Sequence, residues 1–186
     1  MRAGWRLAAV VKNVPGADHL SDPALLLPVS AVTRIADSVV IPLFRPANRR
    51  QALEEAESLA ASDFPALLDP TAVVPSRLSL GRGCYINAGC ILGGAVRLGE
   101  FVFVNRAASL GHHCTIGDFA SIGPGAVLCG QVVVGEAAFI GAGAIILPGH
   151  RIGPAAVVAA GAVVDRDVPA GTVFHPDRVV PQRPAR

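Results

Sequence analysis

The feature that most constrains the fold is an aliphatic residue that recurs at every sixth position. From Leu68 to Val164, 17 successive positions spaced by six residues are all Leu, Ile or Val. The position four residues after each of these is mostly small and never carries Asp, Glu, Lys or Arg. A fixed short period of this kind indicates a repeat architecture, in which each unit buries its apolar face against its neighbours.

A period of six fits neither an α-helix, which repeats every 3.6 residues, nor an alternating strand, which repeats every two. It fits a solenoid of short strands joined by corners, with the aliphatic and the small positions pointing inward. Glycine often follows the aliphatic position, as at Gly81, Gly111 and Gly141, and glycine tolerates the φ angles that sharp corners require. We expect three repeats to form one triangular coil, with successive coils stacked ~4.8 Å apart like strands of a sheet.

The composition restricts the partners of the chain. Hydrophobic residues make up 52% and charged residues 16% of the 186 residues, so either burial is unusually efficient or an apolar surface pairs with copies of the chain. The net charge is +2 without a basic run, which argues against nucleic acid as a partner. No apolar stretch reaches the roughly 18 residues of a membrane span, and the N-terminal apolar run is too short for a signal peptide. We therefore expect a cytoplasmic protein without membrane contact.

Residues 1–67 do not follow the repeat. Two apolar runs, "RLAAVV" and "SVVIPLF", predict short buried strands, and "NRRQALEEAESLAA" predicts a helix with Asn48 as its N-cap. We therefore divide the chain into a small, truncated α/β domain over 1–67, the repeat over 68–169 and a C-terminal tail over 170–186.

The register of the repeat also assigns places to the cysteines and to one histidine. Cys84, Cys90 and Cys114 fall on the inward small position, so we expect buried packing thiols and no disulfides. Cys129 falls on a corner. His150 falls on the inward small position as well, and we expect it to be packed in the core; the alternative is that "LPGHRIG" bulges and releases it.

The repeat resembles that of the hexapeptide-repeat acyltransferases, whose units read aliphatic–Gly–x–x–small–x. The resemblance covers residues 68 to about 169 and implies a mainly β fold, a left-handed parallel β-helix, assembled as a homotrimer. "GHHCTIGDFASIGPGAVLCG" resembles the sugar acetyltransferase branch typified by sialic-acid O-acetyltransferase and bacillosamine N-acetyltransferase, and "RPANRR" is similar to the "GNPxxR" that begins a helix there. The resemblance implies transfer of an acetyl group from acetyl-CoA to an amine or hydroxyl of a sugar.

The same resemblance implies roles for individual residues. His112 matches the general base, a task that suits an imidazole because it titrates near neutral pH. Asn105 matches an asparagine that positions the base or the acceptor, although Asn is also common at corners. Ser121, Ala142 and Ala160 match positions along bound acetyl-CoA, and Ser121 stands where one branch has a histidine.

Two neighbours of His112 complete the candidate site. His113 stands where the branch has Asp or Glu, and it either contacts the substrate or orients the base, or has no role. Gly130 follows His112 by one coil, so it either leaves room for the thioester and donates its amide to the oxyanion, or is a plain corner glycine. The glycine-rich nucleotide-binding loop of the branch is not recognisable, so a nucleotide-linked and a free sugar both stay open.

Three other readings remain. The acceptor could be a non-nucleotide small-molecule amine or alcohol, or the chain could be a non-catalytic trimeric scaffold that binds without turnover. The γ-class carbonic anhydrases share the β-helix and bind zinc through three histidines. We expect no metal here, because the adjacent side chains of His112 and His113 should diverge at outward positions.

Overall fold

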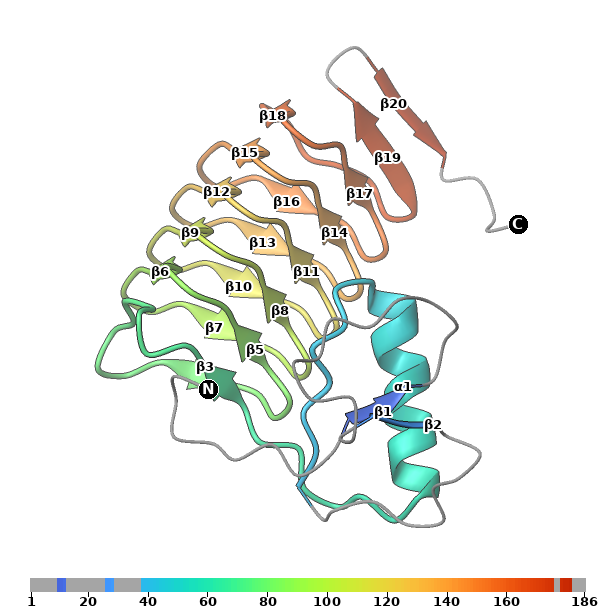
Figure 1. Cartoon of the computed structure of the whole chain (residues 1–186). Helices are drawn as coiled ribbons and strands as arrows, with labels where there is room; N and C mark the ends of the chain where they lie inside the picture. The colour runs from blue at the N-terminus through green and yellow to red at the C-terminus, as the bar shows by residue number, and fades with distance from the viewer. Residues whose placement is uncertain (1–9, 13–25, 29–37, 176–177, 182–186) are drawn as a thin grey trace.

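The main body of the protein is a left-handed parallel β-helix, as predicted (Figure 1). The computed structural model describes residues 10–12, 26–28, 38–175 and 178–181. Strands one coil apart pair in parallel and in register, for example Ser109 with Val127. The coil of three six-residue repeats is therefore the structural unit, and each coil satisfies the backbone groups of the next.

Three sheets, parallel except for the antiparallel pair β19–β20, form the faces of a triangular prism, and we name each by what covers or lines its outside. The helix-side sheet contains β3 (Leu67–Leu68), β5 (Tyr85–Ile86), β8 (Phe103–Val104), β11 (Ser121–Ile122), β14 (Phe139–Ile140), β17 (Val157–Val158), β19 (Thr172–His175) and β20 (Arg178–Pro181). The open sheet contains β6 (Ile91–Leu92), β9 (Ser109–Leu110), β12 (Val127–Leu128), β15 (Ile145–Ile146) and β18 (Val163–Val164). The arginine sheet contains β4 (Ser79–Leu80), β7 (Arg97–Leu98), β10 (Thr115–Ile116), β13 (Val133–Val134) and β16 (Arg151–Ile152).

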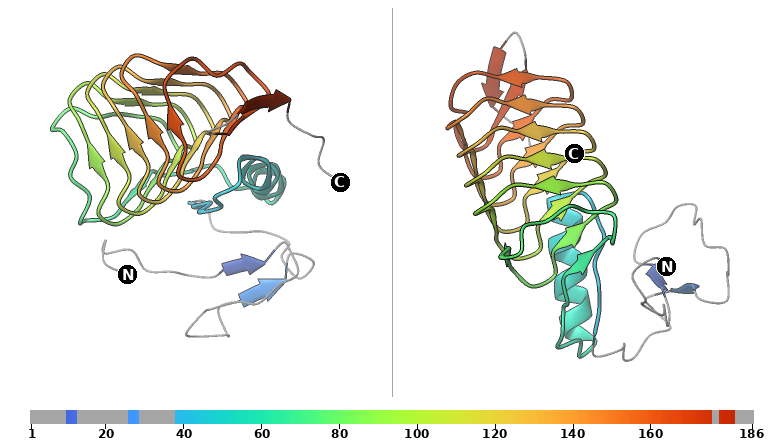
Figure 2. Two further views of the ribbon diagram at one scale, coloured as in Figure 1. Left: turned by 90° about the horizontal axis from the view of Figure 1, so that it is seen from above. Right: turned by 90° about the vertical axis from the view of Figure 1, so that its left-hand side faces the viewer.

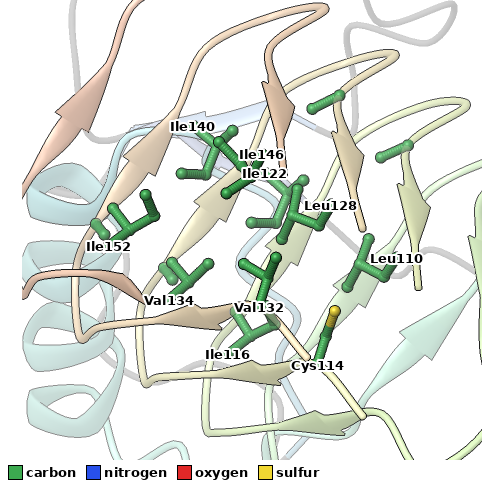
Figure 3. Close-up of a cluster of buried hydrophobic side chains, with 14 of the residues drawn as sticks. Leu110, Cys114, Ile116, Ile122, Leu128, Val132, Val134, Ile140, Ile146 and Ile152 are labelled. Carbon is green, nitrogen blue, oxygen red and sulfur yellow. The ribbon is translucent and has the colours of Figure 1, made fainter. Parts of the chain in front are cut away.

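The core is a set of stacked aliphatic columns inside the prism (Figure 3). The second residue of each short strand points inward, and Ile122 and Leu128 are at most 1% exposed. Burial of each such side chain contributes about 1.5–3 kcal/mol, so the columns supply most of the stability. Cys84, Cys90 and Cys114 are buried free thiols, as expected, and burial raises the pKa of Cys84 to about 11.

Residues 38–66, which we call the N-terminal segment, lie outside the coils and beside the helix-side sheet (Figures 1 and 2). Its helix, α1 (Pro46–Ser58), has Arg45 as its N-cap, so the prediction of Asn48 is wrong. Proline occupies the first turn, where its missing N–H costs nothing and its φ already suits a helix. The predicted strand at 38–44 is also wrong beyond a bridge from Ser38 to Asp63, because this stretch docks through its side chains and not through a ladder.

A separate pair of strands precedes this segment. β1 (Val10–Lys12) and β2 (Leu26–Pro28) pair in parallel. Val10 and Val11 belong to the predicted strand "RLAAVV", whose first four residues lie outside the described part of the chain. In the described ranges, no helix is long and apolar enough to cross a membrane.

Arg49 fastens α1 to the prism. Its side chain is 1% exposed, and its guanidinium donates hydrogen bonds to the carbonyl oxygens of Phe101 (2.8 Å) and Phe119 (2.5 Å) and to Ser121 Oγ (3.0 Å). Burial lowers the pKa of Arg49 to about 10, which still leaves the group charged at neutral pH. Phe44 adds ring contacts to the outer face of the sheet. The helix-side sheet is thus covered by the chain itself.

The open sheet has no such cover among the described residues. Its outward positions carry exposed apolar side chains along the prism, interrupted by the half-buried Ser109 of β9. We call these side chains the apolar stripe, which consists of Val73 (61% exposed), Ile91 (52%), Val127 (37%), Ile145 (37%) and Val163 (51%).

Candidate active site

The predicted catalytic histidine lies on one edge of the prism. His112 and His113 follow β9 in the corner that joins the open sheet to the arginine sheet, and Gly130 occupies the same corner one coil later. We call these three residues the histidine edge. Both imidazole rings are exposed to solvent, so neither is part of the core.

Gly130 lies directly against the imidazole of His112. A β-carbon added at Gly130 would be 2.6 Å from Nε2 and 2.7 Å from Cε1 of His112, which is far closer than atoms can approach. The backbone of His112 is held by a hydrogen bond from Gln131 N to its carbonyl oxygen (2.8 Å). The imidazole therefore occupies this place only because residue 130 has no side chain.

The amide N–H of Gly130 donates to no acceptor among the residues that the structure describes. Side-chain oxygens cap the equivalent amide at some corners, since Asn105 Oδ1 accepts from Arg106 N (2.8 Å) and Asn87 Oδ1 accepts from the amide that follows it. At other corners, as at Gly94, the equivalent amide also lacks an acceptor among the described residues, so what distinguishes Gly130 is its place against the imidazole of His112. Cys129 precedes Gly130 and has no side-chain oxygen to play this part. A fixed N–H donor thus lies beside a base, which is the arrangement that stabilises an oxyanion.

His112 and His113 converge, so the expectation that adjacent outward side chains diverge is wrong. Their Nδ1 atoms are 3.0 Å apart, a hydrogen-bond distance, and their rings are nearly perpendicular. The reason is the left-handed backbone of His113, whose φ of 60° departs from the alternation of an extended strand. In the described part of the chain, no group of three or more His, Cys, Asp or Glu side chains could hold a metal ion.

Three of the other predicted residues lie on a different edge, where the helix-side sheet turns into the open sheet. Ala142 and Ala160 are exposed there on successive coils, linked by a hydrogen bond from Gly161 N to Ala142 O (2.8 Å). Asn105 lies on the same edge, and its side-chain partners are Asn87 and Arg106. We call Asn105, Ala142 and Ala160 the alanine edge. One chain therefore does not bring these residues to His112.

Ser121 lies apart from both edges, on β11 under the N-terminal segment. It is 0% exposed, and its hydroxyl donates to Phe44 O (2.5 Å) and accepts from Arg49 (3.0 Å). Contact between Ser121 and acetyl-CoA stays a prediction. Sequence reasoning missed Arg49 and Phe44 because they lie outside the repeat, although "FRPANRR" was available as a signal.

His150 is not in the core, so that prediction is wrong. Its side chain is 28% exposed, and Nδ1 lies 3.4 Å from Asp167 Oδ1. Hydrogen bonds from Arg151 N and from His150 lower the pKa of Asp167. The equivalent inward position one coil below is filled by Val132, which is fully buried and smaller than an imidazole. The larger and polar ring of His150 therefore turns outward.

The known proteins that this chain resembles are found among solved structures. No protein-family profile matches the sequence, and no curated protein matches it. Solved structures do match. The acetyltransferase domain of PglB from Neisseria gonorrhoeae FA1090, in complex with acetyl coenzyme A, is 25% identical with a TM-score of 0.82, over 93% of this chain and 85% of that one.

Two further structures agree with this match. PerB from Caulobacter crescentus, in complex with CoA and GDP-perosamine, is 30% identical with a TM-score of 0.71, over 76% of this chain and 69% of that one. WeeI from Acinetobacter baumannii AYE shares the fold at 24% identity and a TM-score of 0.83, over 95% and 88% of the two chains. The repeat, the histidine edge and these likenesses lead to one conclusion: the chain is an acyltransferase that belongs to the hexapeptide-repeat sugar acetyltransferase family.

Proposed function

We propose that this chain transfers the acetyl group of acetyl-CoA to an amine or hydroxyl of a sugar, with His112 as the general base. The observation that carries the proposal is the solvent-exposed imidazole of His112, whose Nε2 lies against Gly130, a residue with an unpaired amide. A base near neutral pH and a fixed N–H donor are the two groups that acyl transfer requires. The PglB domain solved with acetyl coenzyme A and PerB solved with CoA and GDP-perosamine support this choice of substrates.

The residues of the histidine edge divide the reaction between them. His112 Nε2 accepts the proton of the acceptor amine or hydroxyl as its nitrogen or oxygen attacks the thioester carbonyl carbon. The new C–N or C–O bond forms, and the Gly130 amide donates to the oxyanion that develops. The C–S bond then breaks, and His112 returns the proton to the departing CoA thiolate, so no other reactant is consumed.

We further infer that the working form is a homotrimer. The histidine edge and the alanine edge flank the open sheet on its two sides. Three copies that turn their open sheets toward a common axis would bury the apolar stripe and place the histidine edge of one copy beside the alanine edge of the next. Ala142 and Ala160 would then line the acetyl-CoA site, and Asn105 would reach the base of the neighbouring copy.

The acceptor is proposed to be an amino sugar, either nucleotide-linked, as GDP-perosamine is for PerB, or free. A cytoplasmic location, where acetyl-CoA is made, is part of the same proposal. A small non-sugar amine remains the alternative acceptor, and the panel of the following experiment separates the two.

The first test is release of the CoA thiol by the purified protein with acetyl-CoA and a panel of amino sugars and simple amines. We expect acceptor-dependent release that His112→Ala abolishes. His150→Ala is the matched control, because His150 has its own partner in Asp167 and should keep full activity. Release that survives His112→Ala contradicts the role of the base, and a wild-type protein that neither releases thiol nor binds CoA favours the scaffold.

Gly130→Ala tests the geometry more directly. The added methyl group must displace the imidazole of His112, and a misplacement of about 1 Å costs on the order of 100-fold in rate. Gly94→Ala is the matched control, since Gly94 occupies the same corner one coil below His112 and a β-carbon there meets nothing within 4 Å. Equal activity of the two variants would contradict the proposed site.

A further inference from the structure

We propose that His113 is a positioning residue that holds His112 in the tautomer able to act as a base. This inference rests on the proposed function and deepens it. The two Nδ1 atoms are 3.0 Å apart, so one of them carries a hydrogen and the other offers a lone pair. A neutral pair has two such arrangements, and they differ in what they leave at the far nitrogen of His112.

Only one arrangement leaves a base. If His112 Nδ1 donates to His113 Nδ1, then His112 Nε2 carries a lone pair and His113 carries its hydrogen on Nε2. If the direction is reversed, His112 Nε2 already carries a hydrogen and cannot accept another. Of the His112 atoms, Nε2 lies nearest to the position that a β-carbon of residue 130 would occupy. The direction of one hydrogen bond therefore decides whether this nitrogen can take a proton.

The surroundings of Nε2 favour the productive direction. The carbonyl of Gly130 is already used, because it accepts from Gly149 N (3.0 Å), whereas the Gly130 amide keeps its hydrogen unpaired. A lone pair on Nε2 suits the free N–H donor of Gly130, whereas a hydrogen on Nε2 would have to bond to solvent or share the Gly130 carbonyl with Gly149 N. The flanking corner residues Ala95 and Gln131 carry no charge, so no carboxylate in these corners competes for the Nδ1 hydrogen of His112.

The same hydrogen bond serves through the reaction. When His112 Nε2 takes up the proton of the acceptor, its Nδ1 hydrogen keeps its partner, and the bond becomes charge-assisted and stronger. His113 neither gains nor loses a proton. A neutral imidazole therefore replaces the hydrogen-bond acceptor that a carboxylate would supply, without adding a negative charge to the site.

The left-handed backbone of His113 offers a way to separate this role from a merely structural one. Glycine adopts a φ of 60° without strain, and Asn tolerates it better than most residues. His113→Gly therefore relieves the turn and removes the acceptor, whereas His113→Asn keeps both a tolerated turn and an oxygen that can accept from Nδ1. If His113 served only the turn, Gly would be at least as good as His.

We expect His113→Gly to lower kcat by about 10-fold to 100-fold with an unchanged KM for acetyl-CoA, because the base loses its orientation and tautomer. His113→Asn should restore most of kcat, and thermal unfolding should show both variants folded. A His113→Gly variant with the kcat of the wild type would overturn the inference, as would an Asn variant no better than Gly.

Nitrogen-15 NMR of the imidazole rings tests the inference without any acceptor. In the neutral wild-type protein we expect the hydrogen of His112 on Nδ1, and in His113→Gly a shift toward the Nε2–H form. If the wild type is inactive but carries the His112 hydrogen on Nδ1, the proposed function is wrong and the proposed effect of His113 on the tautomer still holds. If the wild type is active but carries the hydrogen of His112 on Nε2, only the proposed role of His113 is wrong.

Discussion

The helix-side sheet and the open sheet are built from the same repeat but have different surroundings. On the helix-side sheet, the outward residues Phe103 and Phe139 meet Phe44, with ring centroids 5.5 and 4.8 Å apart. On the open sheet, outward residues such as Val127 and Ile145 are exposed. Because the inward columns of both sheets are alike, the inward positions specify the prism, and one outward residue per coil specifies what packs on each face.

The helix-side sheet also shows how a segment without the repeat is held in place. Its outward column carries aromatic rings at Tyr85, Phe103 and Phe139, and between the last two lies Ser121, a small polar residue that leaves room for the backbone of Phe44 and bonds to it. Arg49 then donates to the carbonyl oxygens of Phe101 and Phe119, which accept from no backbone amide of the described coils. The open sheet offers aliphatic side chains at every outward position except Ser109, and these suit a flat contact with an identical face.

The largest expected effect is at Arg49, which fastens the N-terminal segment to the helix-side sheet. Arg49→Ala leaves the buried carbonyl oxygens of Phe101 and Phe119 unpaired, and we expect it to lower the free energy of unfolding by about 3–5 kcal/mol. Urea unfolding measures the loss. Arg49→Lys should be only partly better, because an ammonium cannot reproduce the guanidinium fork, and a loss below about 1 kcal/mol for Ala would contradict the clamp.

The open sheet is tested by placing a charge on the apolar stripe. We expect Val127→Glu to weaken self-association by about 100-fold, because it replaces a burial worth roughly 1.5–3 kcal/mol by a buried carboxylate. Light scattering would show smaller particles, and activity should fall with the assembly. Thr115→Glu is the control, since Thr115 is the equivalent exposed residue on the arginine sheet. An assembly that survives Val127→Glu but not Thr115→Glu would move the interface to the other face.

A smaller effect is expected at Phe44. Phe44→Ala removes the contacts with Phe103 and Phe139 but keeps the backbone carbonyl that binds Ser121 and Arg49. Because Phe44 is only half-buried, we expect a loss of about 2 kcal/mol, below the range of fully buried aromatic residues. Protease cleavage between residues 44 and 46 should become faster while the coils stay resistant. Unchanged cleavage would mean that Arg49 alone secures the segment.

The smallest effect is expected at Arg50, next to the buried clamp but on the surface. Arg50 pairs with Glu136 (2.7 Å) and lies over the ring of Phe119. Both partners are exposed, so Arg50→Ala should cost at most about 1 kcal/mol, and the cost should shrink in high salt. Urea unfolding at low and high ionic strength measures this. A loss as large as that of Arg49→Ala would show that charge, and not burial, holds α1.

The sequence predicted the prism well because its signal is local and repeated. Each coil contributes the same inward pattern, so errors at one position do not change the register, and the inward placement of Cys114 and its relatives was confirmed. The N-terminal segment was predicted less well. Its helix boundary was off by a few residues, and the stretch at 38–44 is bound by Arg49 and Phe44 contacts to residues far along the chain.

By itself, the sequence determined which residues face inward, where the corners fall and that Gly130 lies one coil above His112. These follow from a period of six and from the rule that equivalent positions of a solenoid stack. Only the tertiary structure decided that His113 turns toward His112, that His150 turns outward and that Ser121 is covered. Each of these depends on a backbone angle, on the room left in one column or on a partner from outside the repeat, and no periodic pattern encodes those quantities.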